Sequence, residues 1–559
     1  MENTMTFLKI SSLIILILIS ISIFSCTRSK NSSATLAIIN ARIWTGDSSN
    51  PWAEAISIQN DTITAVGDNS TIENFISEKT KVIDAQGQFV CPGFTDSHVH
   101  FLEGGMRLAS VNLRNAQTPE EFTKKIKNYA DTLKPGTWIL GGDWDHTNWG
   151  GKLPEKSWID SVTPENPVWV SRLDGHMALA NSKTLDLAGI DNSVKDTAGG
   201  TFIRDGKGNL TGILKDNAME KVESIIPEPG EDLKMKALNA AMDHVHSMGV
   251  TSVHHMGSWD DLKIFEKARA KDSLKVRIYA AVPIHTVDRL ARKLKEQEQE
   301  DKWLKIGGLK GFIDGSLGSH TAAMFEPYTD ALEDYGLIVT EKENMYEMVK
   351  KGDRIGAQLI VHAIGDRANH MILNIYEKVM DENGERDRRF RIEHAQHLIP
   401  EDIPRFDELN VIPSMQPYHC IDDGRWAEPL IGKNRMQTTH AYHSLLDNNA
   451  HLIFGSDWYV APPSPLKGIY AAVTRATLDG KNPSGWVPDQ KISVEEALQA
   501  YTISPAFASF DEDIKGSLEP GKLADLVILN QDITQIDPEN IWDVKVVKTI
   551  VGGEVVWAF

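Results

Sequence analysis

Cysteine, positive charge and long apolar runs are all scarce in this chain. Only 3 of its 559 residues are cysteine, which excludes a fold held together by many disulfides. Cys91 and Cys420 fall in the part that is expected to fold, and we expect two buried free thiols in preference to one disulfide. The 58 Lys and Arg residues are outnumbered by 78 Asp and Glu residues, and the net charge of -20 argues against binding to nucleic acid, because phosphate contacts need clustered positive charge. Beyond residue 26 no run is apolar enough to cross a membrane.

The first 26 residues have a pattern of their own. Lys9 precedes a largely aliphatic run over residues 10–24, and Ser25 and Cys26 follow this run directly. This pattern is typical of a bacterial lipoprotein signal that is removed before Cys26, whose thiol then carries lipid. An uncleaved anchor helix is the alternative, but the run is short for a membrane span. We therefore expect a signal peptide over residues 1–25 and a polar tether over 26–35. The exported protein would be held at a membrane by its lipid alone, with the globular part in the periplasm or outside the cell.

Two histidines stand one residue apart at the end of an apolar, strand-like run. They are His98 and His100, which follow Pro92 and Gly93. Side chains at positions i and i+2 of an extended segment point the same way, so both imidazoles can reach one point. The alternative is a chance pair of packing histidines, but a paired motif of this kind at a strand end favours a metal site.

Seven later segments complete a set of eight strands. Four read as buried strands that carry a residue suited to metal chemistry, over residues 309–314, 359–362, 390–394 and 452–457, and three are further apolar runs over 250–256, 276–283 and 411–417. Helix-like stretches separate the later strands, and this alternation predicts an α/β protein with a (β/α)8 TIM barrel, whose functional residues gather at the carboxyl ends of the strands. In strand order the candidates are His98 and His100 on the first, Lys310 on the fourth, His362 on the fifth, His394 on the sixth and Asp457 on the eighth.

The chain is too long for the barrel alone. Short alternating segments near both chain ends read as hairpins, which predicts a small β-sandwich domain built from residues 34–90 and 510–559. The barrel then spans residues 91–509. A large insertion of about residues 102–249 follows its first strand, far longer than an ordinary connection.

Several ordered motifs give the chain a family resemblance. They lie at residues 92–101, 141–145, 172–176, 181–182, 314–319, 362–368, 393–396, 455–458 and 516–527. With these motifs the sequence resembles the amidohydrolase superfamily, and more narrowly the YtcJ-like group of metal-dependent hydrolases that includes N-substituted formamide deformylases. The resemblance covers nearly all of the chain after the signal.

The metal ligands follow from the residues and from this resemblance. His98 and His100 can hold one divalent cation, and His362 and His394 can hold another. The resemblance implies that Lys310 takes up carbon dioxide and bridges two cations as a carbamate; an unmodified Lys310 beside a single cation is the alternative. Asp457 is the expected ligand, general base and general acid. Zinc is the first choice among zinc, iron, manganese and nickel, with one or two ions per chain.

Three further residues are candidates for substrate contact. His176 lies in a motif that the family places near the substrate, and the alternative is a surface loop histidine. Trp144 belongs to a tryptophan-rich stretch of the insertion, where a packing role is the alternative. His320 stands where the family usually has arginine, which changes a fixed planar cation into a titratable ring.

These observations predict a hydrolase that uses metal-activated water to cleave a non-peptide C–N bond, of the amide or formamide type, in a small molecule. One alternative is a mononuclear deacylase or esterase on the same barrel. The other is an inactive, ligand-binding lipoprotein, which is disfavoured because all six metal-facing positions keep competent residue types.

Overall fold

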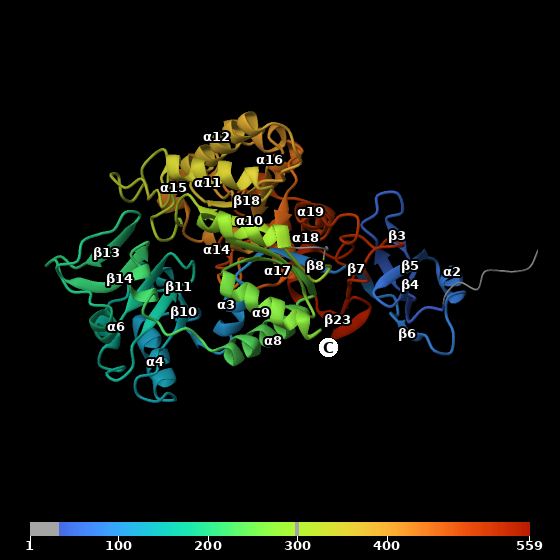
Figure 1. Ribbon diagram of the computed structural model, residues 1–559, viewed down its shortest axis with the longest axis horizontal. Helices are drawn as coiled ribbons and strands as arrows, with labels where there is room; N and C mark the ends of the chain where they lie inside the picture. Colours follow the sequence, from blue (N-terminus) through green and yellow to red (C-terminus); the bar gives the residue numbers. More distant parts are fainter. Residues whose placement is uncertain (1–32, 297–300) are drawn as a thin grey trace, which may run out of the picture.

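A computed structural model describes residues 33–296 and 301–559 of the protein (Figure 1). The predicted signal peptide and Cys26 lie outside the described residues, so the lipid anchor stays a prediction. Within the described ranges, no helix is both long enough and apolar enough to span a bilayer.

The centre of the molecule is an eight-stranded parallel sheet whose strands follow one another in chain order. The strands are β8 (Phe94–Val99), β15 (Val250–Met256), β16 (Arg277–Pro283), β17 (Leu304–Phe312), β18 (Gln358–Ala363), β19 (Arg391–His394), β20 (Ile412–Met415) and β21 (Ile453–Phe454). Just beyond β21 the chain meets β8: the Asp457 N–H donates to the His98 carbonyl (2.7 Å), and the His100 N–H donates to the Trp458 carbonyl (2.7 Å). These bonds close the sheet into the predicted TIM barrel and bring the first and last strands together.

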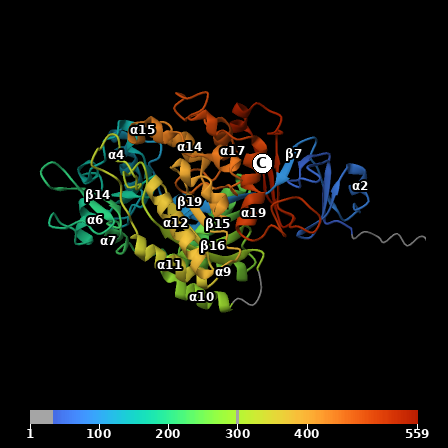
Figure 2. The same cartoon turned by 90° about the horizontal axis from the view of Figure 1, so that it is seen from above.

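Helices cover the outside of the barrel (Figures 1 and 2). They are α3 (Phe101–Arg107), α8 (Glu231–Ser247), α9 (Trp259–Ala270), α10 (Val287–Glu296), α11 (Lys342–Arg354), α12 (Asp366–Asn383), α13 (Arg405–Glu408), α14 (Pro417–Asp423), α15 (Glu428–Met436), α16 (Tyr442–Asp447), α17 (Pro465–Thr474), α18 (Val494–Tyr501) and α19 (Ile503–Ala508). Local sequence sets several of their starts. Ser258 and Asp261 form a reciprocal capping box at the start of α9, which satisfies N–H groups that have no partner within the helix.

The two chain ends share a β-sandwich beside the barrel, as expected from the sequence (Figure 1). One sheet has the order β5-β4-β1-β6, formed by Thr62–Gly67, Ala55–Gln59, Leu36–Ile39 and Lys81–Asp84. The other has the order β24-β23-β22-β7-β2-β3, formed by Glu554–Ala558, Val546–Val551, Leu526–Leu529, Phe89–Pro92, Arg42–Trp44 and Trp52–Ala53. Apolar residues from both ends, such as Ile38, Ile56 and Ile528, bury one another in a common core, which ties the termini together.

The long connection between β8 and β15 forms a separate lobe on the opposite side of the barrel (Figure 1). Its sheet has the order β13-β14-β12-β11-β10-β9, formed by Gly200–Arg204, Leu210–Asp216, Met177–Ala180, Trp169–Arg172, Gly141–Trp144 and Val111–Asn112. Helix α4 (Pro119–Ala130) begins after Thr118, whose side chain accepts from the Glu121 N–H, and has proline at its first position. The shorter helices are α5 (Lys156–Ile159), α6 (Ser182–Leu187) and α7 (Glu220–Glu223).

The cysteines of the described part agree with the sequence prediction. Cys91 and Cys420 are both buried and both free. Burial raises the pKa of each thiol, to about 11 for Cys420, so they act as small apolar side chains.

Candidate metal centre

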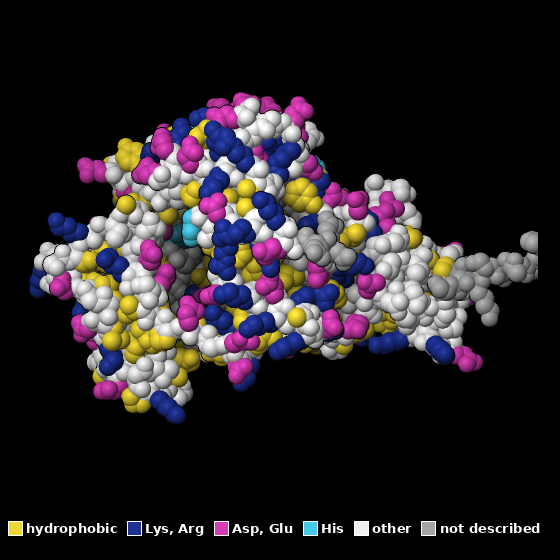
Figure 3. All heavy atoms as spheres, in the orientation of Figure 1, with side chains coloured by type: hydrophobic (Ala, Val, Ile, Leu, Met, Phe, Trp, Pro, Cys, Tyr) yellow, Lys and Arg dark blue, Asp and Glu magenta, His cyan; other side chains and the backbone are white. Residues whose placement is uncertain are grey.

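A cavity of about 200 Å³ opens at the carboxyl ends of the barrel strands. It is lined by all six predicted metal-facing residues, together with His176, with His419 and Asp423 of α14, and with Trp426. Histidine comes to the surface between the insertion and the barrel in Figure 3. The position of the cavity is the one that this barrel uses for chemistry, since loops from different strands converge there.

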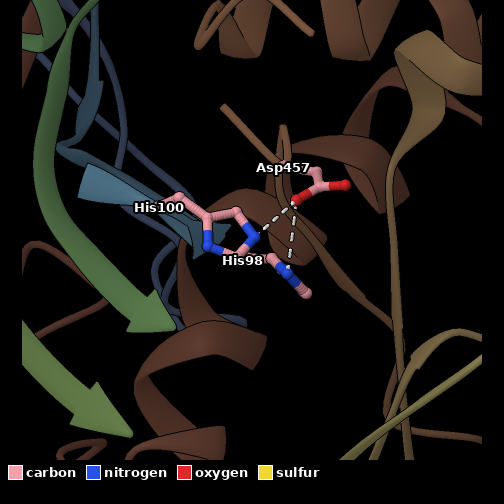
Figure 4. A group of neighbouring side chains, drawn as sticks. All are labelled: His98, His100 and Asp457. Carbon is pink, nitrogen blue, oxygen red and sulfur yellow. Dashed lines mark ion pairs between the residues drawn. The ribbon is translucent and has the colours of Figure 1, made fainter. Parts of the chain in front are cut away.

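His98, His100 and Asp457 form the first group of potential ligands (Figure 4). The Nε2 atoms of His98 and His100 lie 3.4 and 3.3 Å from Asp457 Oδ1. Asp457 Oδ1 is buried and accepts no hydrogen bond. Burial alone would raise the pKa of Asp457, but the nearby histidines bring it well below its usual range, so this carboxylate is ionised.

A buried ion pair beneath the site orients His98. Its Nδ1 contacts the Glu393 carboxylate, which also accepts from Arg391 Nε (2.8 Å) and from Ser414 Oγ (2.8 Å). Burial lowers the pKa of His98 to about 4, so the ring is neutral and its one N–H is directed to Glu393. The lone pair at Nε2 is therefore directed to the cavity, as a metal ligand requires.

His394 and His419 form a second group with the same Asp457. Gln416 Oε1 lies 2.7 Å from His394 Nδ1, which leaves Nε2 of that ring for the site. The backbones of His394 (φ 73°) and Asp457 (φ 58°) both lie in the left-handed region, which costs energy in a residue with a Cβ and is typical of functional sites. No motif of the sequence marks His419; its only signal is its place on α14, four residues after the end of the seventh strand.

Lys310 and His362 reach the same cavity but have other close partners. Lys310 Nζ lies 3.4 Å from His98 Nε2, and burial lowers the pKa of this amine to about 8. His362 Nε2 lies 2.9 Å from the Gly315 carbonyl, and its ring centre is 4.5 Å from that of His394. Among the described residues, neither group of three potential ligands includes His362. The carbamate on Lys310 and the ligand role of His362 stay predictions.

His176, a candidate for substrate contact, lies at the cavity wall. Its Nδ1 is 2.7 Å from Asp216 Oδ1. Burial works against the charged ring, but Asp216 outweighs it and raises the pKa of His176 to about 8. The insertion thus supplies a hydrogen-bond donor above the metal-facing residues.

The other two residues expected to contact the substrate, Trp144 and His320, do not line this cavity. Trp144 is fully buried in the core of the insertion, donates from Nε1 to the Val170 carbonyl (2.9 Å) and does not line the cavity. His320 also lies outside the lining, because it stacks on Tyr328 with ring centres 4.3 Å apart and faces Asp330 and Asp334. In each case the side chain packs against neighbouring residues outside the cavity.

The residues of this site fit a divalent cation. Two buried polar atoms, Asp457 Oδ1 and His419 Nε2, have no hydrogen-bond partner in the protein, and an unsatisfied buried polar atom is costly. Neutral imidazoles and an ionised carboxylate are also the donor set that zinc and its neighbours prefer.

Fold and site together define a metal-dependent hydrolase barrel. The sequence model of the amidohydrolase family matches residues 81–557, and the chain belongs to that family and its superfamily of metal-dependent hydrolases.

LONG AFTER FAR-RED 3 from Arabidopsis thaliana is 42% identical over 93% of this chain and 91% of its own length. N-substituted formamide deformylase from Arthrobacter pascens is 26% identical over 93% of this chain and 97% of its own. An uncharacterized metal-dependent hydrolase from Pyrococcus furiosus has a crystal structure that is 31% identical, with a TM-score of 0.70 over 89% of this chain and all of that one. The resemblance seen in the sequence is confirmed.

Proposed function

We propose that the protein hydrolyses a non-peptide C–N bond, of the amide or formamide type, in a small molecule. The observation that carries the proposal is the convergence of His98, His100, His394 and Asp457 at one rim of the barrel. The similarity to an N-substituted formamide deformylase supports the bond type. The cavity of about 200 Å³ suits a small substrate and leaves no room for a folded partner.

The metal would be held by His98, His100 and Asp457, with His394 and Lys310 beside them. A divalent cation, zinc as first choice, acidifies water and polarises a carbonyl group when it is bound in such a site. One or two ions per chain would bind, two if Lys310 is carboxylated.

Asp457 is the residue that would carry the proton. It is ionised, buried and without a donor at Oδ1, so it can accept a proton from attacking water and return it to the leaving nitrogen. His176 stands across the cavity with Nδ1 occupied by Asp216, so its other nitrogen can donate to the oxygen that becomes negative as water adds to the carbonyl. Asp216 already holds the His176 ring in place for this role.

The experiment measures bound metal and turnover on the same purified protein. Metal content per chain is determined first, and N-formyl, N-acyl and cyclic amides and simple esters are then screened. We expect turnover of an amide and a loss of about 10²- to 10⁴-fold in Asp457→Asn, with metal lost from His98→Ala. Full turnover by Asp457→Asn would refute the role of Asp457, and a single metal ion with preference for esters would favour the mononuclear alternative.

We also propose that the protein is exported and anchored by lipid at Cys26. The apolar run over residues 10–24, the small residue before Cys26 and the polar stretch after it support this proposal. The enzyme would then meet its substrate outside the cytoplasm.

A further inference from the structure

We propose that Asp423 is a specificity-determining residue that binds a positively charged group of the substrate. The inference rests on the proposed function and deepens it by naming the substrate class: amides of a small molecule that also carries an amine. Asp423 is the last residue of α14 and lines the same cavity as Asp457. Among the described residues, neither group of potential metal ligands includes Asp423.

The carboxylate of Asp423 has no cationic partner of its own. Its side chain is only 15% exposed, and its Oδ2 accepts from Nε2 of the neutral Gln396 amide (2.6 Å). Oδ2 also faces His440 Nε2 (3.6 Å), but burial lowers the pKa of His440 well below its usual range, so that ring is neutral. Within the described ranges, no lysine or arginine forms an ion pair with Asp423. Carboxylates with so little exposure are normally paired, which indicates that a ligand supplies the missing positive charge.

Gln396 adds a free acceptor beside this carboxylate. It is 3% exposed and lines the cavity, two residues after the end of β19. Because Nε2 of Gln396 faces the carboxylate of Asp423 as a donor, Oε1 is fixed on the other side of the amide group. No donor in the described part of the chain reaches that oxygen. A carboxylate and an amide oxygen side by side suit a group with several N–H donors, such as an ammonium ion.

The arginines near the cavity do not offer an equivalent site for an anion. Arg172 lines the cavity, but its terminal nitrogens contact Asp174 (2.6 Å) and Asp145 (3.2 Å). Arg425 lies outside the lining and also contacts Asp145 (3.3 Å). Both arginines act on Asp423 only from a longer distance, and burial raises its pKa to about 6, so the carboxylate is still ionised at neutral pH. The unpaired charge of this wall is therefore negative.

The position of Asp423 keeps a bound amine apart from the metal-facing residues. The ring of His419 lies 6.4 Å from that of His394, measured between centres. Asp423 follows His419 by four residues on α14, which is one helical turn or about 6 Å along the helix. An amine at Asp423 would thus be separated from the divalent cation that would repel it. Trp426, which also lines the cavity, adds an aromatic face to which a cation is attracted.

The test compares matched formamides on the purified full-length protein with its bound metal. The probes are mono-N-formyl diaminoalkanes with a charged end, N-formyl alkylamines of the same length with a neutral end, and N-formyl ω-amino acids with an anionic end. The value of kcat/KM is measured for each probe. Calorimetry then compares the binding of diaminoalkanes with that of monoalkylamines, which does not depend on turnover.

Asp423→Asn is the test variant, and Glu428→Gln is the matched control. Glu428 is a nearby carboxylate at the start of α15 that does not line the cavity, so its loss removes one negative charge without touching the proposed site. Circular dichroism and thermal unfolding verify that each variant folds. The probes on wild type decide the inference even where a variant does not fold.

We expect wild type and Glu428→Gln to prefer the charged formamide to the neutral and anionic ones, and to bind diaminoalkanes more tightly than monoalkylamines. Asp423→Asn should reduce both preferences by roughly 10- to 100-fold, because it removes a hydrogen bond between charged groups. Preference of wild type for the neutral or anionic probes would overturn the inference, as would unchanged preferences in Asp423→Asn. Absence of turnover of every amide would refute the proposed function, and the calorimetry would still decide whether Asp423 binds an amine.

Discussion

Replacing Glu393 by glutamine tests whether this carboxylate orients His98 for the proposed cation. Glu393 is fully buried and joins His98 to Arg391, although 295 residues separate it from His98 in sequence. Glutamine has nearly the same shape but carries no charge. Its amide group would present a donor to His98 Nδ1 or leave that nitrogen with a weaker acceptor, so the ring would no longer be fixed with a lone pair at Nε2.

The geometry gives an expected loss of stability and an expected loss of metal affinity. Burial would raise the pKa of Glu393, yet Arg391 and His98 bring it to about 2, below its ordinary value of 4.5. That difference corresponds to about 3 kcal/mol of stabilisation of the ionised form at neutral pH, and removing one partner of a buried ion pair typically costs roughly 3–5 kcal/mol. Loss of a carboxylate that orients a histidine ligand lowers metal affinity by about 10- to 100-fold. We therefore expect Glu393→Gln to lose both stability and metal affinity.

The assay separates these two losses by means of a matched control. Asp402 is a buried carboxylate that faces His370 Nδ1 (3.1 Å) and accepts from Arg405 (2.9 Å), but it does not line the cavity. Asp402→Asn should therefore lose stability in urea unfolding of the apoprotein without a change in zinc affinity, which is measured by chelator competition.

Zinc affinity and stability of Glu393→Gln decide between these roles of the carboxylate. If Glu393→Gln bound zinc as tightly as Asp402→Asn and wild type, the contact with Glu393 would not orient His98 for a cation. Equal stability of Glu393→Gln and wild type would show that Arg391 finds another partner for its buried charge.

Four further changes have defined outcomes. Trp144→Ala should lower the free energy of unfolding by about 3–5 kcal/mol in urea and leave KM unchanged, because Trp144 packs in the insertion core; a KM effect alone would place it at the substrate. His176→Gln should lower kcat about 100-fold with little change in KM, and wild-type kcat should fall as pH rises through the His176 pKa of about 8; a flat profile would contradict its role as a donor. Burial lowers the pKa of His246 to about 4, so the native state binds fewer protons than the unfolded chain between pH 6.5 and 4. Wild type should therefore lose up to about 3 kcal/mol of stability as the pH falls across that window. His246→Gln should lack this part of the pH dependence in unfolding curves. Cys26→Ser should move the protein from the membrane fraction to the supernatant of a bacterial host, and an unchanged distribution would count against the lipid anchor.

Much of the site was available from the sequence because it depends on local rules. The alternation of strands and helices predicts the barrel, and the barrel places the ends of its parallel strands around one rim. His98, His100, His394 and Asp457 stand at such ends, so their convergence needs no knowledge of side-chain packing.

The rest depended on loops and on contacts between distant elements. His419 lies on a short helix after β20, and whether such a residue faces the cavity depends on how α14 packs against the barrel. Trp144 and His320 carry side chains that could line a pocket. In the structure, however, Trp144 packs in the insertion core and His320 stacks on Tyr328. A single sequence gives no means of choosing among such packing partners.

The sequence by itself determined the barrel, the sandwich of both chain ends and the strand-end candidates for metal binding, since periodicity and strand order are encoded over short stretches of chain. Only the tertiary structure decided that Glu393 orients His98, that His419 joins His394, and that His176 from the insertion faces the same cavity. Those relations join residues that are far apart in the chain or lie on irregular segments, and only the packing of the complete fold fixes the distances between them.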